Sequence, residues 1–259
     1  MVVNTAAGRV PVLAGAGGYD TRGVIDLVAD MRGAGADGIL SVTPYYNKPT
    51  PEGIYQHYRA IAESTPLPIV VYNVPGRTGC NVDVGTLCRL ADIPNIVGVK
   101  EASANMPQMC EICRAVPTGF SVLSGDDLFT VPLLSVGGSG VISVASNEAP
   151  EEMSRLVSVA LNGDFDTARQ LHTRLLPLMQ VNFIETNPIP VKAAMAEMGW
   201  VGIIIPEAHG GSDFGFLSAG LVIEELGKTL TASPLVATTI AASAILLGGS
   251  DAQKAKWLP

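Results

Sequence analysis

Residues 38–72, which read GILSVTPYYNKPTPEGIYQHYRAIAESTPLPIVVY, decide the fold. The stretch opens and closes with short apolar runs, 38–42 and 69–72, whose β-branched side chains are typical of buried strands. Between them, Thr50 is followed at once by proline and glutamate, and these residue types mark the start of a helix. The next twelve residues, EGIYQHYRAIAE, place apolar side chains at helical spacing. The stretch therefore predicts two parallel strands joined by a helix.

The same unit recurs through the first part of the chain. Apolar runs begin at intervals of 20 to 31 residues, and helical patterns such as RGVIDLVADMR, with Thr21 as its cap, lie between them. The predicted strands are Val10–Ala14, Gly38–Val42, Ile69–Tyr72, Ile96–Lys100, Ser121–Ser124 and Val141–Val144. Both doubly wound sheets and (β/α)8 barrels show this alternation.

Polar residues directly after the strands favour a barrel. Barrels carry chemistry at the ends of many strands, whereas a doubly wound sheet concentrates it at one switch point. Such residues follow five of the runs: Tyr45 and Tyr46, Tyr72 and Asn73, Lys100 and Glu101, Asp126 and Asp127, and Ser146 and Asn147. We therefore predict an α/β fold, an incomplete TIM barrel with about six of the eight βα units, followed by a helical C-terminal segment.

The second part of the chain changes character near Met198. Up to that point the sequence reads as helices, PEEMSRLVSVALNGD, FDTARQLHTRLLPLMQ and IPVKAAMAEMG. From Gly199 it becomes glycine-rich and loop-like, GWVGIIIPEAHGGSDFG, before two further helical patterns. We predict two domains, residues 1–198 and residues 199–259.

Composition narrows the class of protein. The chain has 259 residues, 47% of them hydrophobic and 15% charged, with a formal net charge of −8. No basic stripe is visible, which argues against a nucleic-acid-binding protein. The two long uncharged stretches, 128–147 and 229–250, are broken by glycine, proline and small polar residues, so neither is predicted to span a membrane. The first residues lack a signal-peptide pattern, and we expect a cytoplasmic protein.

Lys100 ends the run IVGVK. The two-residue period of a strand predicts that it faces the same side as Ile96 and Gly98. At the mouth of a barrel such a lysine is partly desolvated, which lowers the pKa of its amine and frees it for Schiff-base chemistry. The alternative is a solvated lysine at a strand end, which is the ordinary case for a lysine taken alone.

The segment YNVPGRTG, residues 72–79, follows a predicted strand and contains a Pro-Gly turn. Its arginine, Arg77, could hold a carboxylate through two hydrogen bonds, and Tyr72 could transfer protons. The alternative is a structural turn with a surface arginine. For Tyr45 and Tyr46, packing, a proton relay and contact with another subunit all remain open.

Two further motifs receive structural interpretations. Asp126 and Asp127 could bind a metal, but a carboxylate that caps the following helix is the preferred interpretation. Cys110 and Cys113 form a C-x2-C pair inside a helical pattern, without a second pair nearby. We interpret them as core cysteines rather than as a zinc or redox site, and we predict no metal site.

Six segments together resemble a known family in order and spacing: TPYYNKPTPEGIYQHY, YNVPGRTG, GVKEAS, LSGDD, GVISVASN and NPIPVKAAM. They are similar to dihydrodipicolinate synthases, a family of class I aldolase-type (β/α)8 barrels. The resemblance covers about residues 2–198. Related pyruvate lyases share the tyrosine and the lysine but usually lack an arginine at the position of Arg77.

The resemblance implies an activity and a set of site residues. The activity is the condensation of pyruvate with L-aspartate 4-semialdehyde in lysine (diaminopimelate) biosynthesis, in a homo-oligomer, the family tetramer, without a metal or organic cofactor. The implied roles are a Schiff base on Lys100, proton transfer by Tyr72 and by Tyr46 of a neighbouring subunit, a carboxylate anchor at Arg77, and a pyruvate pocket lined by Gly125 and the Ile142 backbone.

The chain departs from this pattern in two places. The first two strands of the family, with a Gly-Thr-Thr-Gly-Glu-type loop that holds the pyruvate carboxylate, match no residues here, so we expect impaired turnover. Residues 199–259 instead resemble the N-terminal helical part of acyl-CoA dehydrogenases. A related pyruvate-dependent aldolase, a non-catalytic chimeric fragment and an acyl-CoA- or flavin-associated protein therefore remain alternatives.

Overall fold

The structure is a computed structural model that describes residues 2–195. The chain divides into two compact units, Met1–Gln180 and Val181–Pro259. The second unit is described only as far as Met195, so the predicted boundary at residues 198 and 199 lies outside the described residues.

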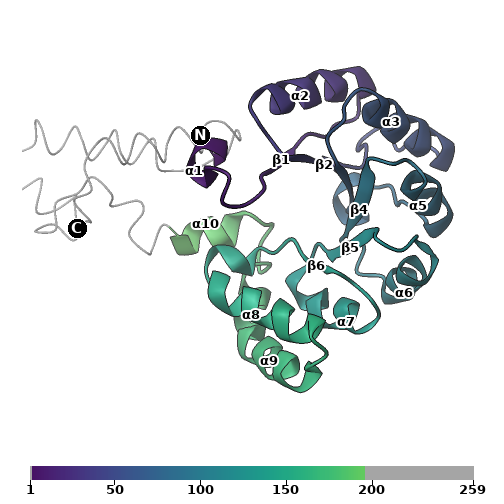
Figure 1. The fold of residues 1–259 in the computed structure, drawn as a ribbon. Coiled ribbons are helices and arrows are strands. Elements are labelled where there is room, and N and C mark those ends of the chain that lie inside the picture. Colours follow the sequence, from purple (N-terminus) through teal and green to yellow (C-terminus); the bar gives the residue numbers. More distant parts are fainter. Residues whose placement is uncertain (1, 196–259) are drawn as a thin grey trace, which may run out of the picture. The chain divides into compact units, whose positions relative to one another are not determined.

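Six parallel strands form one sheet, and their order in the sheet is their order in the chain. They are β1 (Leu13–Gly15), β2 (Gly38–Val42), β3 (Ile69–Asn73), β4 (Ile96–Glu101), β5 (Ser121–Ser124) and β6 (Gly140–Val141). The sheet curves, and the helices that connect the strands lie along its outer side (Figure 1). The prediction of about six βα units of a TIM barrel is confirmed.

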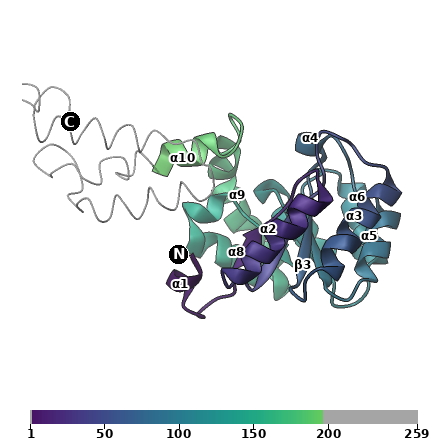
Figure 2. The same ribbon diagram turned by 90° about the horizontal axis from the view of Figure 1, so that it is seen from above.

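The helices alternate with these strands and then follow the sheet. In the first unit they are α1 (Val2–Ala6), α2 (Thr21–Gly33), α3 (Pro51–Glu63), α4 (Pro75–Thr78), α5 (Val84–Ala91), α6 (Met106–Ala115), α7 (Thr130–Ser135), α8 (Pro150–Leu161) and α9 (Phe165–Val181). The last of these helices runs one residue past the boundary between the units. Two 3-10 turns, η1 (Asp127–Phe129) and η2 (Ala145–Asn147), lie in the same unit. In the second unit α10 (Ile189–Met195) is described. The short helix α4 lies at one end of the strands, apart from the longer helices α3, α5 and α6 (Figure 2).

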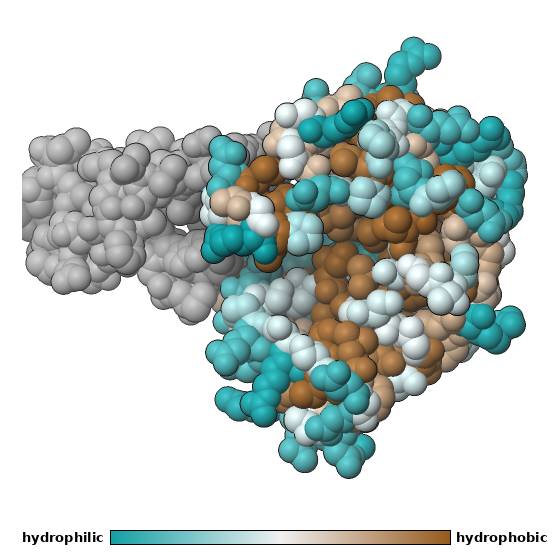
Figure 3. Space-filling model, viewed as in Figure 1, coloured by the Kyte–Doolittle hydropathy of each residue, from teal (hydrophilic) through white to brown (hydrophobic). Residues whose placement is uncertain are grey.

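The main core fills the space between the sheet and its outer helices. Fully buried aliphatic side chains come from the strands (Ile39, Val71 and Val99) and from the helices (Ile61, Leu87 and Ile112). Burial of each such side chain contributes about 1.5–3 kcal/mol. Hydrophilic residues lie around the rim of the face shown in Figure 3, and hydrophobic ones gather towards its middle. No helix within residues 2–195 is long and apolar enough to cross a membrane.

The two predicted helix starts have different outcomes. Thr50 caps α3 as predicted, because its hydroxyl accepts a hydrogen bond from the backbone N–H of Gly53. The cap of α2 is Asp20 and not Thr21, since the Asp20 carboxylate accepts from two N–H groups of the first turn. The Thr21 hydroxyl instead lies 2.8 Å from Nδ1 of His57.

A bulge in β4 changes which way Lys100 points. Ile69 pairs with Ile96, but the next residue of β3 pairs with Gly98, so Val97 is an extra residue. An extra residue reverses the alternation of side chains along a strand. Ile96 therefore belongs to the core beside the helices, whereas Lys100 lies on the other face of the sheet. The prediction that Lys100 faces the same side of the sheet as Ile96 is wrong. Lys100 does face the same side as Gly98, as predicted.

The two outer strands are shorter than predicted or are displaced. The first begins at Leu13 rather than Val10, because Pro11 has no N–H and the N–H of Val12 donates to the Asp37 carboxylate. The last ends at Val141 rather than Val144. The N–H groups of residues 144 and 145 donate to the carboxylate of Asp127 and are not available to a neighbouring strand.

Candidate functional site

Lys100 and Tyr72 lie side by side at the carboxyl ends of β4 and β3. The two residues are register partners in the parallel pairing of these strands. Parallel pairing places partners on the same face, and the Lys100 Nζ lies 4.2 Å from the centre of the Tyr72 ring. The structure thus brings together an amine and a phenol, the two groups that the sequence singled out at these strand ends.

The surroundings of Lys100 lower the pKa of its amine. Burial lowers the pKa of the Lys100 amine, and the nearby Arg77 guanidinium lowers it further. The Asp127 carboxylate acts in the opposite direction and offsets part of this decrease. A lowered pKa gives a larger fraction of nucleophilic amine near neutral pH.

The pKa of Tyr72 is shifted in the opposite direction to that of Lys100. Burial raises the pKa of its phenol, so the hydroxyl keeps its proton, while Arg77 partly opposes this increase and the Asp126 carboxylate adds to it. Arg77 lies in α4, the short helix that begins two residues after β3 ends, and its side chain is exposed. The Arg77 charge therefore lowers the pKa of both members of the pair.

Thr43 fixes the backbone at Tyr72. Its N–H and its hydroxyl both donate to the carbonyl oxygen of Tyr72, at 2.9 and 2.7 Å. The Thr43 side chain is fully buried at the end of β2. Sequence reasoning assigned this threonine no role, although its place directly after a predicted strand is a signal that could have found it.

Gly125 leaves the space that the Lys100 side chain occupies. A Cβ atom at this position would lie 3.1 Å from both Cγ and Cε of Lys100, and 2.7 Å from the Cβ of Ala102. Ile142 follows β6, and its N–H donates to the carbonyl oxygen of Ser124. Of its backbone groups, only the carbonyl is therefore available to a ligand. The pyruvate-lining roles of Gly125 and Ile142 stay predictions.

The two aspartates after β5 have separate roles. Asp126 caps the turn η1 through a bond from the N–H of Leu128, as the capping interpretation predicts. Asp127 is buried and caps no helix of its own. Its Oδ2 accepts from the backbone N–H groups of Val144 and Ala145, which fixes the loop after β6 against the loop after β5.

Tyr46 lies on an exposed loop after β2. Its side chain is 87% exposed, its φ angle is +67°, and its ring is 6.5 Å from that of Tyr19. Tyr45 also contacts Tyr19, edge to face at 5.5 Å. The three tyrosines form an exposed aromatic cluster, and the role of Tyr46 in a neighbouring subunit stays a prediction.

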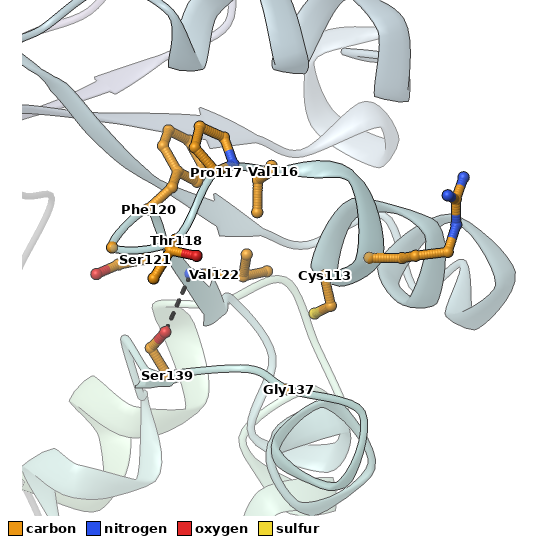
Figure 4. Close-up of a pocket in the computed structure, with 11 residues that line it drawn as sticks. Cys113, Val116, Pro117, Thr118, Phe120, Ser121, Val122, Gly137 and Ser139 are labelled. Carbon is orange, nitrogen blue, oxygen red and sulfur yellow. Dashed lines mark hydrogen bonds between the residues drawn. The ribbon is translucent and has the colours of Figure 1, made fainter.

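The C-x2-C pair is not a pair of core cysteines. Cys110 is exposed on α6, so that interpretation is wrong for it, while Cys113 is partly buried. Cys113 lines a pocket of about 540 Å³ together with residues at the start of β5 and before β6, where the Ser139 hydroxyl faces the N–H of Val122 (Figure 4). This pocket is at the amino ends of the strands, opposite Lys100. No group of three metal-binding side chains occurs within residues 2–195.

A sheet of parallel βα units, with a partly buried amine and a phenol at the carboxyl ends of adjacent strands, defines the class as a barrel-type α/β protein. The comparison with known families narrows this class. Residues 1–205 match the family model described as the dihydrodipicolinate synthetase family, and the chain belongs to that family.

Similar proteins include synthases from several bacteria. The 4-hydroxy-tetrahydrodipicolinate synthase of Syntrophus aciditrophicus is 53% identical over 199 residues, which are 77% of this chain and 68% of that protein. The synthase of Koribacter versatilis is 53% identical over 193 residues, 74% of this chain and 64% of that protein. The crystal structure of dihydrodipicolinate synthase from Thermotoga maritima is 48% identical, with a TM-score of 0.75 over 76% of this chain and 68% of that one. The chain thus spans about two thirds of the length of these relatives.

A second family model matches the other end of the chain. Residues 165–259 match the N-terminal domain of acyl-CoA dehydrogenases, and this match overlaps the first one. The resemblance inferred for residues 199–259 is therefore confirmed at the level of sequence.

Proposed function

We propose that this chain is a Schiff-base-forming lyase that condenses pyruvate with L-aspartate 4-semialdehyde in lysine (diaminopimelate) biosynthesis. The observation that carries the proposal is the lysine–tyrosine pair, in which the Lys100 amine lies 4.2 Å from the Tyr72 ring. Family membership and the names of the similar synthases support the choice of substrates.

The unprotonated Lys100 amine attacks the carbonyl carbon of pyruvate. Water leaves, and an imine forms between the Lys100 nitrogen and that carbon. Loss of a methyl proton then gives the enamine, whose terminal carbon forms the new C–C bond with the aldehyde carbon of the second substrate. The amine of the product attacks the imine carbon, closes the ring and releases Lys100.

The remaining residues supply protons and hold the substrates. Tyr72 keeps its phenol proton and donates or accepts it as water leaves and the enamine forms. Arg77 holds the carboxylate of the aldehyde substrate at the mouth of the site. Tyr46 joins the relay from a neighbouring subunit, so we propose a homo-oligomer, as in the family tetramer. Gly125 and the Ile142 carbonyl line the space for pyruvate.

The threonine loop of the family matches no residues in this chain, and we therefore expect reduced turnover. In the family that the chain resembles, the threonines of this loop also complete the proton relay, and loss of one positioned acid–base partner removes about 10²–10⁴-fold in rate. To test this expectation, the turnover number of the 259-residue chain is compared with that of a version extended by two N-terminal βα units and the family C-terminus. Equal turnover of the two proteins would refute the expected role of the loop.

A condensation assay tests the function itself. The purified chain is incubated with pyruvate and aspartate semialdehyde, and the cyclic product is measured. Lys100→Ala should abolish product formation, and Arg77→Ala should raise the aldehyde concentration needed for half-maximal rate more than it lowers the maximal rate. Product formation by Lys100→Ala at the unchanged rate would refute the proposal.

The match of residues 165–259 favours a second candidate, an acyl-CoA- or flavin-associated protein. The two candidates predict different ligands for the purified protein. Flavin absorbance that stays with the chain through gel filtration would support the second candidate, and its absence together with pyruvate capture would support the first. We propose a cytoplasmic location for either one.

A further inference from the structure

A second pair of side chains occupies the opposite face of the same two strand ends. Asn73 directly follows Tyr72, Glu101 directly follows Lys100, and Asn73 and Glu101 are themselves register partners. Both side chains are fully buried. The Nδ2 atom of Asn73 donates to Oε2 of Glu101 over 2.9 Å. A reactive pair and a buried polar pair therefore lie back to back across two strands.

This polar pair connects the loops that surround the site. The Oδ1 atom of Asn73 accepts from the N–H of Val82, and Nδ2 also donates to Oδ1 of Asn81, both in the segment after α4. The Oε1 atom of Glu101 accepts from the N–H of Ser103 in the loop after β4, over 2.7 Å. Side chains on two strands thus hold the segment after the Arg77 helix and the segment after Lys100.

The backbone of the same residues extends the connection. The carbonyl of Asn73 accepts from the N–H of Ala102, and the carbonyl of Glu101 accepts from the N–H of Gly125. Gly125 is the residue whose missing side chain leaves room for Lys100. The network therefore fixes the ends of β3, β4 and β5 relative to one another.

Burial of an amide and a carboxyl group costs free energy unless every polar atom has a partner. Apolar side chains of similar volume would usually stabilise the fold as well or better. What short, directional hydrogen bonds add is a fixed geometry. Because neighbouring residues of a strand are about 3.3 Å apart along it, a shift at position 73 or 101 moves position 72 or 100 as well.

We propose that Asn73 and Glu101 are positioning residues, which hold the Tyr72 phenol and the Lys100 amine at the separation that imine formation requires. The assignment rests on the proposed function of Lys100. Neither side chain faces the substrate, so both act through the strand ends that they fix. Displacement of a reacting group by about 1 Å costs up to 10²-fold in rate.

The test is a pyruvate-capture assay on the full chain. Borohydride reduces the imine on Lys100 to a stable secondary amine, and the first-order capture rate is measured at saturating pyruvate as a function of pH. Glu101→Gln keeps the size of the side chain but places an NH2 group against either Ser103 N–H or Asn73 Nδ2, both of which are donors. The control, Glu111→Gln, makes the same chemical change at an exposed residue of α6 that pairs with Arg114.

We expect Glu101→Gln to lower the capture rate by about 10–100-fold. We also expect its pH midpoint to rise towards that of an ordinary lysine, because water reaches a displaced Lys100. The groups that face this amine, Tyr72, Arg77 and Asp127, are unchanged by the substitution. Glu111→Gln should behave as the unchanged chain.

A double variant that exchanges the amide and the carboxylate between positions 73 and 101 distinguishes a positioning role from the mere loss of a native residue. In the double variant Asn73→Asp with Glu101→Gln, the new carboxylate accepts from the new amide and still accepts from the Val82 N–H. The exposed Asn81 amide, which accepts from Asn73 in the unchanged chain, turns over and donates to the new carboxylate. The double variant should recover most of the capture rate and the original pH midpoint. If Glu101→Gln does not fold, Asn81→Ala, at the exposed end of the network, should show a smaller change in the same direction.

The outcomes distinguish the two proposals. If the unchanged chain captures no pyruvate, the proposed function fails and the positioning roles fail with it. If the unchanged chain captures pyruvate and Glu101→Gln matches it in both rate and pH midpoint, only the positioning roles are refuted. A double variant that folds but recovers neither property also refutes them.

Discussion

Replacement of Gly125 by alanine should displace Lys100 and slow imine formation. The added methyl carbon would lie 2.7 Å from the Ala102 Cβ and 3.1 Å from two carbons of the Lys100 side chain. Carbon atoms in good contact are about 3.5–4.0 Å apart. The Ala102 contact therefore has to open by roughly 1 Å. The Lys100 side chain has to move by several tenths of an ångström as well.

Both the stability and the reactivity of the chain should respond. Overpacking of this kind costs about 1–3 kcal/mol of unfolding free energy. A displacement of about 1 Å at a reacting group costs up to 10²-fold in rate. We therefore expect borohydride capture of pyruvate by Gly125→Ala to be about 10–100-fold slower than by the unchanged chain.

The matched control is Gly33→Ala at the end of α2. A Cβ atom at Gly33 meets nothing within 4 Å, and its backbone conformation is one that alanine adopts. Capture rate is measured at saturating pyruvate, and unfolding is followed by circular dichroism. Gly125→Ala with the capture rate of Gly33→Ala would show that Lys100 is not confined as described.

Three further outcomes follow from the charges, burial and exposure of single residues. Asp127→Asn should lower the pH midpoint of pyruvate capture, because the Asp127 carboxylate raises the pKa of Lys100, and an unchanged or higher midpoint in a pH series would contradict this. Burial lowers the pKa of His57 to about 4, so the unfolded chain takes up a proton below about pH 6.5 while the folded chain does not. The free energy of unfolding should therefore fall as the pH drops from 6.5 towards 4. Chemical denaturation of His57→Gln at a series of pH values should show a weaker dependence of that free energy on pH. Tyr46→Phe should reduce product formation by about 10²-fold while pyruvate capture by Lys100 persists, and a variant with full turnover would exclude Tyr46 from the relay.

Periodicity and strand-end chemistry were enough to predict the sheet and the places of Lys100 and Tyr72 near the carboxyl ends of their strands. The stretch 38–72 folds as its pattern indicates, with Thr50 as the helix cap. Lys100 and Tyr72 lie near the ends of adjacent strands, as the sequence indicates, but the bulge at Val97 is what makes them register partners. The strands, the helix cap and the strand-end places depend on local sequence, which is why they could be predicted from it.

The failures arise where residues distant in the chain decide the outcome. The bulge at Val97 depends on how β4 pairs with β3, and an alternating pattern carries no sign of it. The end of β6 is set by Asp127, about 17 residues away along the chain. The polar pair of Asn73 and Glu101 was visible as two residues after strands, but its meaning depends on their register.

The most direct test of the account is to identify which residue captures pyruvate. The full chain is incubated with pyruvate and borohydride, digested and mapped by mass spectrometry. The account predicts that a single peptide, the one that contains Lys100, gains the mass of pyruvate less one oxygen atom, and that Lys100→Ala gains nothing. Modification of the Lys100→Ala chain to the same extent, or of lysines at random, would contradict it.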